Sequence, residues 1–244
     1  MRRPEVPLSD AGIWDDGQAA AYKRITDFVH GQGAIAGIPI SHAGRKASTA
    51  PPWEGDVSVE PEAGGRQTVA PCGDPRRARL SAAPVPVTAG QPPQRLVQVT
   101  DAVRAQWPEG RPLFVRFSAT DWADGGWTPE ETVELSRHLV AHGVDLVDIT
   151  SSGLVHNARI EVEPGYQVPL ARTVREGAAL PVSAIGLTTA PEQADQILVD
   201  RPADAIILAR ELLRNPTWPL HAAHVLGDDV PWPKQYQRGR QRHR

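Results

Sequence analysis

The chain has 244 residues, of which 40% are hydrophobic and 23% are charged, and its net charge is −3. This is ordinary globular usage with enough chain for one TIM barrel, and it excludes the strongly basic field that recruits nucleic acid. The single cysteine, Cys72, excludes an intrachain disulfide framework. Without an apolar run of ~20 residues or a signal-peptide centre, we expect a cytoplasmic protein that does not enter a membrane.

A helix followed by a strand is predicted first. Asp15 is placed as the N-cap and Gln18 at the capping-box position, and Gly31 and Gly33 end the helix. Its apolar face consists of Ile25, Phe28 and Val29. The run 34–40 (AIAGIPI) predicts a buried strand, although its proline at position 39 lacks a ladder donor.

Polar residues follow that strand directly. His42, Arg45 and Lys46 come at its carboxyl end, where α/β barrels display ligand-binding groups. A ligand contact is one reading, and a structural role for the histidine is the more usual one.

Residues 51–95 form an irregular stretch. Nine of the 24 prolines lie between Pro51 and Pro93, together with five glycines. Such a segment inside a compact domain is unusual, and it is interpreted as a long excursion, a linker or the trace of a deletion.

Helices and strands alternate in the rest of the chain. Thr128, Pro129 and Glu131 form a strong helix start, and Gly143 ends that helix. The predicted strands are 113–118, 144–149, 180–186 and 203–210, and the predicted helices are 96–107, 128–143, 170–176, 191–199 and 211–214. This order predicts parallel βαβ units and an incomplete TIM (β/α)8-type barrel with about five of the eight strands, as one domain over 1–244.

The last two strand ends hold a candidate phosphate site. Gly186 follows one strand and the pair Ala209 and Arg210 follows the next, so backbone N–H groups and a cation could receive an anion. The alternative is that Arg210 pairs with Glu211.

Arg116 lies in the middle of an apolar strand. A buried arginine is rarely unpaired, and the residues slightly favour an ion pair with Asp148 over contact with an anionic ligand. No metal site is predicted, because His138 and His142 lack a third ligand. The tail 234–244 carries five cations and no acid, and we interpret it as a solvated tail rather than a binding arm.

Several motifs together resemble the Old Yellow Enzyme family, most closely its short bacterial NADPH dehydrogenase branch. They are 42–46 (HAGRK), 114–122 (FVRFSATDW), 165–169 (GYQVP), 209–216 (ARELLRNP) and 235–239 (QYQRG). The resemblance implies an FMN-containing TIM barrel that takes hydride from NADPH and reduces the C=C bond of α,β-unsaturated carbonyl compounds.

The resemblance also assigns residues. Arg116 is similar to the family arginine at the flavin ring, and Gly186, Ala209 and Arg210 are similar to its phosphate loops, with alanine where the family usually has glycine. Arg238 is similar to an arginine that reaches the active site of a neighbouring subunit, which implies a homo-oligomer.

The chain departs from the family pattern in three places. Pro39 stands where the family has a flavin-binding glutamine, the first two family strands have no counterpart, and the fourth strand is missing. That strand carries the His/Asn pair that holds the substrate carbonyl and the tyrosine that donates a proton, so no catalytic residue is assigned.

Two alternatives to an FMN-dependent oxidoreductase remain at this point. One is a non-catalytic remnant or subunit-interaction module, since an incomplete barrel exposes strand edges. The other is a barrel enzyme for a phosphorylated small molecule, which the phosphate site alone would support.

Overall fold

The computed structural model describes residues 11–41, 48–51, 59, 61–65, 68–70, 82–84, 94–124, 126–151 and 158–240. The chain divides into two compact units, residues 1–89 and residues 90–244. Each unit is described by itself, and the assignment of one domain to 1–244 stays a prediction.

The first unit contains the predicted amino-terminal helix as α1, Asp16–Gly31. The Asp15 carboxylate accepts the Gln18 backbone N–H at 2.8 Å, as an N-cap should. The Gln18 side chain reaches back to the N–H of Trp14 at 2.9 Å. The start and end of the helix are confirmed, but its apolar face is not buried, because Phe28 is 68% exposed.

The expectation of a buried strand at 34–40 is wrong. Those residues have no strand structure, and Ile35 is 90% exposed. A strand of this kind needs neighbours on both edges, and Pro39 removes one of its own donors. The following residues 42–47, including His42, Arg45 and Lys46, lie outside the described residues.

Short elements occur within the irregular stretch. Strand β1, Thr68–Ala70, pairs in parallel with β2, Ala82–Pro84, and a single 3-10 turn, η3, spans Pro61–Ala63. The described parts of residues 51–95 therefore contain more regular structure than the sequence predicts.

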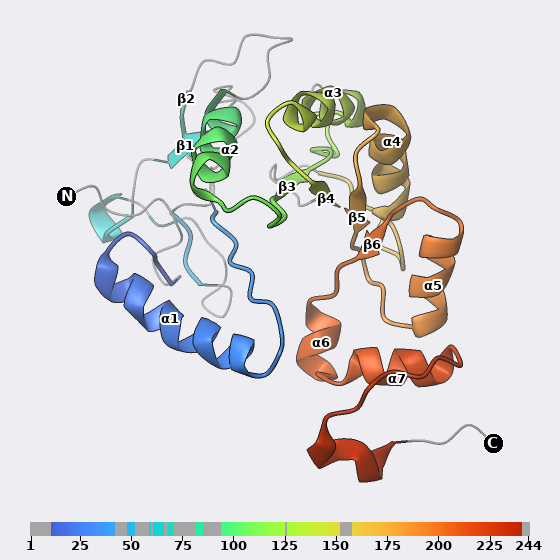
Figure 1. The fold of residues 1–244 in the computed structure, drawn as a ribbon. Helices are drawn as coiled ribbons and strands as arrows, with labels where there is room; N and C mark the ends of the chain where they lie inside the picture. Colours follow the sequence, from blue (N-terminus) through green and yellow to red (C-terminus); the bar gives the residue numbers. More distant parts are fainter. Residues whose placement is uncertain are drawn as a thin grey trace. The chain divides into compact units, whose positions relative to one another are not determined.

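The second unit is built on a four-stranded parallel sheet with the order β3-β4-β5-β6 (Figure 1). The strands are β3 Phe114–Ser118, β4 Leu146–Thr150, β5 Val182–Ala184 and β6 Ala205–Ile206. All four were predicted, and β6 is shorter than the run 203–210. Within the described residues of this unit, β3 and β6 are the edges of the sheet.

The helices of this unit largely match the prediction. They are α2 Gln94–Gln106, α3 Pro129–Val140, α4 Val168–Ala178, α5 Pro191–Val199, α6 Arg210–Arg214 and α7 Trp218–Val225, with a 3-10 helix, η5, at Lys234–Gly239. The helix α7 and the turn η5 were not predicted.

Helix α3 shows how the sequence sets a helix start. Thr128 accepts the Glu131 N–H at 3.3 Å, and the Glu131 carboxylate accepts the Thr128 N–H at 2.9 Å. This reciprocal capping box satisfies two backbone donors that the helix itself leaves unpaired. Leu135 and Leu139 face inward as expected, whereas Val140 is largely exposed.

The hydrophobic core lies between one face of the sheet and the helices α3 and α4, which cover it in Figure 1. Alternate residues of each strand point toward these helices. The fully buried members of the core include Leu139, Val147, Ile149, Val174 and Val182. The residues between them point to the opposite face, where the polar site is found.

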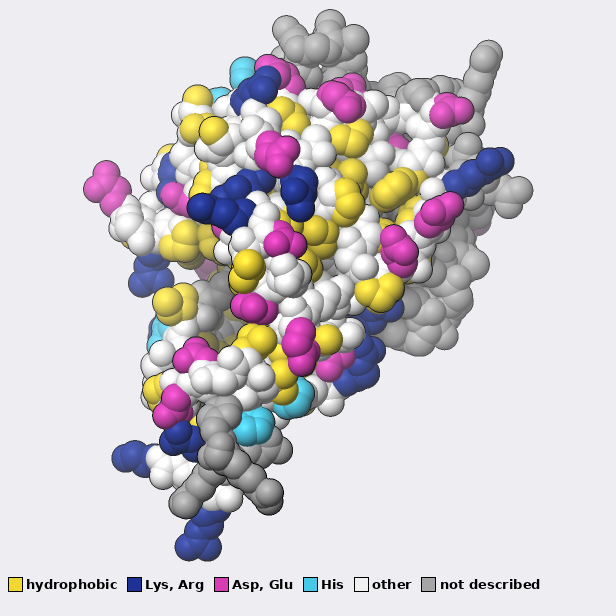
Figure 2. Space-filling view, turned by 90° about the vertical axis from the view of Figure 1, so that its right-hand side faces the viewer, with side chains coloured by type: hydrophobic (Ala, Val, Ile, Leu, Met, Phe, Trp, Pro, Cys, Tyr) yellow, Lys and Arg dark blue, Asp and Glu magenta, His cyan; other side chains and the backbone are white. Residues whose placement is uncertain are grey.

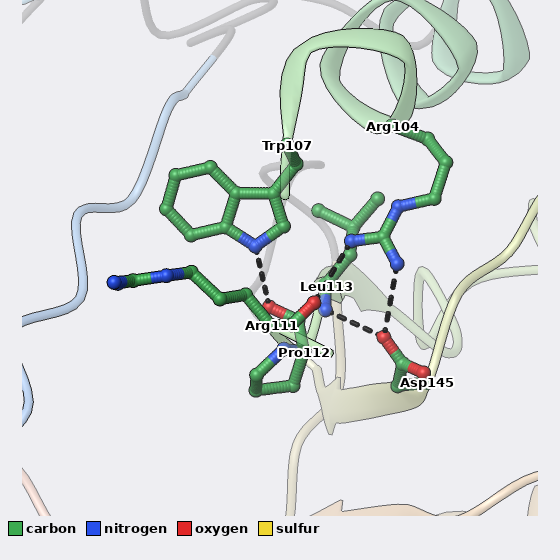
Figure 3. Close-up of polar contacts among 6 residues, drawn as sticks. All are labelled: Arg104, Trp107, Arg111, Pro112, Leu113 and Asp145. Carbon is green, nitrogen blue, oxygen red and sulfur yellow. Dashed lines mark hydrogen bonds and ion pairs between the residues drawn. The ribbon is translucent and has the colours of Figure 1, made fainter. Parts of the chain in front are cut away.

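The amino ends of the strands are held by side-chain contacts to the backbone, which are drawn in Figure 3. The Asp145 carboxylate, one residue before β4, accepts the backbone N–H of Leu113 at 2.7 Å and lies 3.5 Å from the Arg104 guanidinium of α2. The indole N–H of Trp107 donates to the carbonyl of Pro112 at 3.1 Å beside them.

The same arrangement recurs one βαβ unit later. Asp204, one residue before β6, accepts the Val182 N–H of β5 at 3.0 Å and pairs with Arg175 of α4 at 2.8 Å. The Arg175 hydrogen bond is the main reason that the pKa of Asp204 lies below its ordinary value. In each case one aspartate joins the starts of two adjacent strands to the helix before them.

No helix in the described part of the chain combines the length and apolar character that crossing a bilayer requires. Acidic, basic and hydrophobic side chains are interspersed over the face shown in Figure 2.

We predict that Asp204→Asn reduces the acid dependence of stability. A lowered folded-state pKa contributes stability that is complete above the unfolded value of about 3.9 and is lost as pH falls through the folded value. The melting temperature of the wild type should therefore exceed that of the variant at pH 7, and this difference in melting temperature should become smaller below about pH 4. The exposed Asp195→Asn is the control, and a gap that does not change with pH would contradict the assignment.

Gly143→Ala tests the packing of Arg104 behind α3. Gly143 has φ +73°, and an added Cβ would lie 2.8 Å from Arg104 Cδ, whereas Gly110 has φ +80° with no atom within 4 Å of that position. Gly110→Ala should cost about 1 kcal/mol through backbone strain alone. Gly143→Ala should cost about 1 kcal/mol more in a urea titration, and equal losses would show that Arg104 moves away freely.

Candidate functional site

A row of polar side chains crosses the sheet face opposite the core. The strand register places Arg116 beside Asp148 and Asp148 beside Ser183. The Arg116 guanidinium forms an ion pair with the Asp148 carboxylate through Nε, and Ser183 donates to its other oxygen at 2.8 Å. Asp148 is only 4% exposed, so it depends on Arg116 for a countercharge and on Ser183 for a hydrogen bond to its second oxygen.

Arg116 differs from the prediction in its exposure. Its side chain is 54% exposed, although the strand around it is apolar. The ion pair with Asp148, which the residues alone favoured, is present. It uses Nε, and no described residue accepts a hydrogen bond from the two terminal nitrogens. Arg116 can therefore hold Asp148 and still present donors to a ligand.

The carboxyl ends of β4 and β5 enclose the side chain of Gln167, which directly precedes α4. Gln167 is 4% exposed, and its Nε2 donates to the Ser151 carbonyl at 3.4 Å and to the Tyr166 hydroxyl at 2.5 Å. The Oε1 of Gln167 and the Oγ of Ser151 are both buried without a hydrogen-bond partner among the described residues. Unpaired buried polar atoms of this kind are uncommon and indicate a missing ligand or water.

Gly186 closes against this side chain. It has φ +126°, and a Cβ there would lie 3.3 Å from the Gln167 backbone nitrogen and side chain. Its carbonyl accepts the Gly165 N–H at 2.7 Å. The glycine lets the turn after β5 approach Gln167 closely, as the turn of a ligand cradle requires.

Arg210 opens α6 after the sheet's last strand. Its side chain is exposed, and Glu211 pairs with Arg214 at 2.8 Å instead, so the alternative pairing of Arg210 with Glu211 does not occur. Ala209 has a negative φ of −120°, so this position does not require the positive φ that favours glycine. Arg210 has no hydrogen-bond acceptor within the described ranges.

Two other positions stand apart. Arg238 lies exposed in η5, and within the described residues it has no hydrogen bond or ion pair with the sheet. His142 pairs with Asp101 at 2.6 Å rather than with a metal ligand set. Across the described ranges, no group of three or more His, Cys, Asp or Glu side chains could hold a metal ion.

The sequence reasoning missed Gln167 and Ser151. Gln167 lies in the motif 165–169 and Ser151 comes two residues after the predicted strand 144–149, but a glutamine and a serine carry no distinctive chemistry by themselves. The available signal was position: each follows or faces the carboxyl end of a predicted parallel strand.

A parallel sheet with its polar groups on one face and at its carboxyl edge defines an α/β protein of the barrel type. A solved structure of histamine dehydrogenase from Rhizobium sp. 4-9 has the same fold, with a TM-score of 0.62 and 18% identity over 88% of this chain and 38% of that one. Residues 94–229 match the NADH:flavin oxidoreductase / NADH oxidase family. The chain belongs to this family.

Curated relatives support the same conclusion over more of the chain. An NADPH dehydrogenase of Listeria monocytogenes serotype 4a (strain HCC23) is 37% identical over 94% of this chain and 78% of its own length. One of Geobacillus thermodenitrificans (strain NG80-2) is 38% identical over the same shares. The family resemblance, the barrel fold class and the class of FMN-dependent oxidoreductase are thereby confirmed.

The alignment also bears on the missing strand. It spans 268 positions, whereas 94% of the 244-residue chain is about 229 residues, so about 39 positions lack a residue of this chain. That number of positions would be enough for a strand with its connections, and the internal deletion stays a prediction.

The residues present fit a bound flavin mononucleotide in their chemistry. Within the part of the chain that the structure describes, Gln167 and Ser151 offer buried polar atoms without partners and Arg210 offers a cation without an acceptor. Gly186 leaves space that a side chain would fill. Hydroxyl groups of a ligand could bind the buried polar atoms. A phosphate group could approach the backbone beside the glycine and pair with the arginine.

A double-variant experiment tests the polar row. Arg116→Gln leaves the buried Asp148 carboxylate without a countercharge and should lower the free energy of unfolding by about 2–3 kcal/mol. Adding Asp148→Asn removes that charge, so the double variant should be more stable than Arg116→Gln alone in a denaturant titration at pH 7. A double variant less stable than the single one would show that the carboxylate does not depend on Arg116.

Proposed function

We propose that this chain binds FMN at the carboxyl edge of its sheet and acts as an NADPH-dependent flavin oxidoreductase with a low rate of enone reduction. The observation that carries the proposal is a pair of buried polar atoms beside Gly186, on Gln167 and Ser151, which have no hydrogen-bond partner among the described residues. Family membership supports the cofactor, and the names of the curated relatives support NADPH as the hydride donor.

Each residue has a proposed task. Arg116 directs its terminal guanidinium nitrogens to the electron-rich edge of the flavin ring, where a cation stabilises negative charge. Gly186 and the backbone at Ala209 admit the phosphate, and Arg210 neutralises it through charge-assisted hydrogen bonds. When bound, FMN supplies the two-electron chemistry that passes hydride from a nicotinamide to an activated C=C bond.

The low rate follows from what the sequence lacks. The resemblance finds no counterpart for the His/Asn pair that would hold the substrate carbonyl or for the tyrosine that would protonate the product. Without positioning and proton transfer, each of which contributes large factors to a rate, the bound flavin is reduced faster than it reduces an enone.

We further propose a cytoplasmic homo-oligomer that acts on a small molecule. The lone Cys72 is in keeping with a reducing compartment. Arg238 supports the oligomer, because an exposed arginine on the turn η5 is available to a neighbouring subunit.

Two arginines of α6 provide a matched test of the phosphate contact. Arg210→Gln should weaken FMN binding by about tenfold or more, because a charge-assisted contact is worth roughly 1.5–3 kcal/mol. Arg214→Gln changes the same charge four residues away, but that side chain already pairs with Glu211, so FMN affinity should be nearly unchanged. Quenching of flavin fluorescence measures both, and equal losses would place the phosphate elsewhere.

A further inference from the structure

The orientation of the Gln167 amide is set by its neighbours. A backbone carbonyl can only accept a hydrogen bond, so the atom that faces the Ser151 carbonyl at 3.4 Å must be the NH2 group. If the amide were flipped, two oxygens with lone pairs would face each other in a buried site. The contact with the Ser151 carbonyl therefore assigns the NH2 group to this side without reference to a ligand.

The second amide proton is also taken. The Nε2 of Gln167 lies 2.5 Å from the Tyr166 hydroxyl oxygen, which accepts this proton. With both protons used inside the protein, Oε1 is left as a pure acceptor, and it is buried with no donor among the described residues. The group that completes it must therefore be a donor such as a hydroxyl, and a phosphate oxygen would be repelled.

We propose that Tyr166 is a positioning residue that locks the Gln167 amide so that Oε1 faces the ligand as a hydroxyl acceptor. The proposal rests on the proposed function, since the polyol chain of FMN supplies such hydroxyls. Tyr166 is half-buried, so its ring contributes packing that a phenylalanine would keep. The hydrogen bond that holds the Gln167 amide is made by the hydroxyl alone. Without it, one amide proton loses its acceptor, and only the weaker contact to the Ser151 carbonyl remains to hold Oε1 toward the ligand.

The lock is measurable without any cofactor. In the 15N-labelled chain, the side-chain amide resonances of Gln167 are identified as those absent from Gln167→Ala. Tyr166→Phe should shift one of the two proton resonances upfield and speed its exchange with solvent, because that proton loses its acceptor. Unchanged resonances would overturn the proposal, and Tyr22→Phe on α1 is the control for removal of a tyrosine hydroxyl elsewhere.

The effect on binding is tested in a double-mutant cycle. Tyr166→Phe should weaken FMN binding by about five- to tenfold, the size expected for one lost hydrogen bond. In the Gln167→Ala background the same substitution should change affinity by less than about twofold, because Tyr166 acts through Gln167. Equal effects in both backgrounds would overturn the positioning role.

Two further measurements separate a failure of the Tyr166 proposal from a failure of the proposed FMN binding. The melting temperature of Tyr166→Phe without flavin should stay close to that of wild type, and a large drop would make Tyr166 a packing residue instead, overturning the proposal. If wild type binds no FMN, the proposed function fails, and the amide resonances alone then decide for or against the lock.

Discussion

The Asp148 carboxylate is the group on which the site depends most. It is nearly inaccessible to solvent, and it is held from one neighbouring strand by Arg116 and from the other by Ser183. A buried carboxylate is costly unless its partners keep their geometry, so this contact fixes the register of β3, β4 and β5 together. It also fixes Arg116, whose remaining donors then point to the open face of the sheet. Because a buried Asp148 carboxylate without a countercharge would destabilise the fold, the Arg116 guanidinium is held in one position.

The two edges of the sheet have separate roles. At the amino edge, Asp145 and Asp204 make the same two contacts. Each carboxylate accepts a backbone N–H at the start of the adjacent strand and pairs with an arginine from a helix. At the carboxyl edge, buried polar atoms are left without partners. Stabilising contacts at the amino edge and ligand-binding groups at the carboxyl edge are the expected division in barrel proteins.

Sequence patterns predict this second unit well for physical reasons. Alternating elements are encoded locally, and the Thr128 capping box and the Pro191 helix start are read directly from short motifs. The strand at 34–40 could not be judged in this way, because an apolar run becomes a strand only if partners exist for its backbone. Arg116 was placed correctly beside Asp148, yet its exposure depends on how much of the barrel surrounds it. The role of Gln167 could not be predicted for a related reason, because burial without a hydrogen-bond partner depends on three-dimensional packing.

The central claim is that the remaining strands still form a cofactor site, and a visible absorbance spectrum tests it most directly. The purified chain is mixed with excess FMN, desalted and scanned, and its thermal unfolding is recorded in parallel. The account predicts a flavin band that survives desalting and a raised melting temperature, because a ligand that binds only the folded state stabilises it. A cooperative melt with no retained band would contradict it and favour a non-catalytic interaction module. Stabilisation by simple sugar phosphates without flavin would contradict it in favour of an enzyme for phosphorylated small molecules.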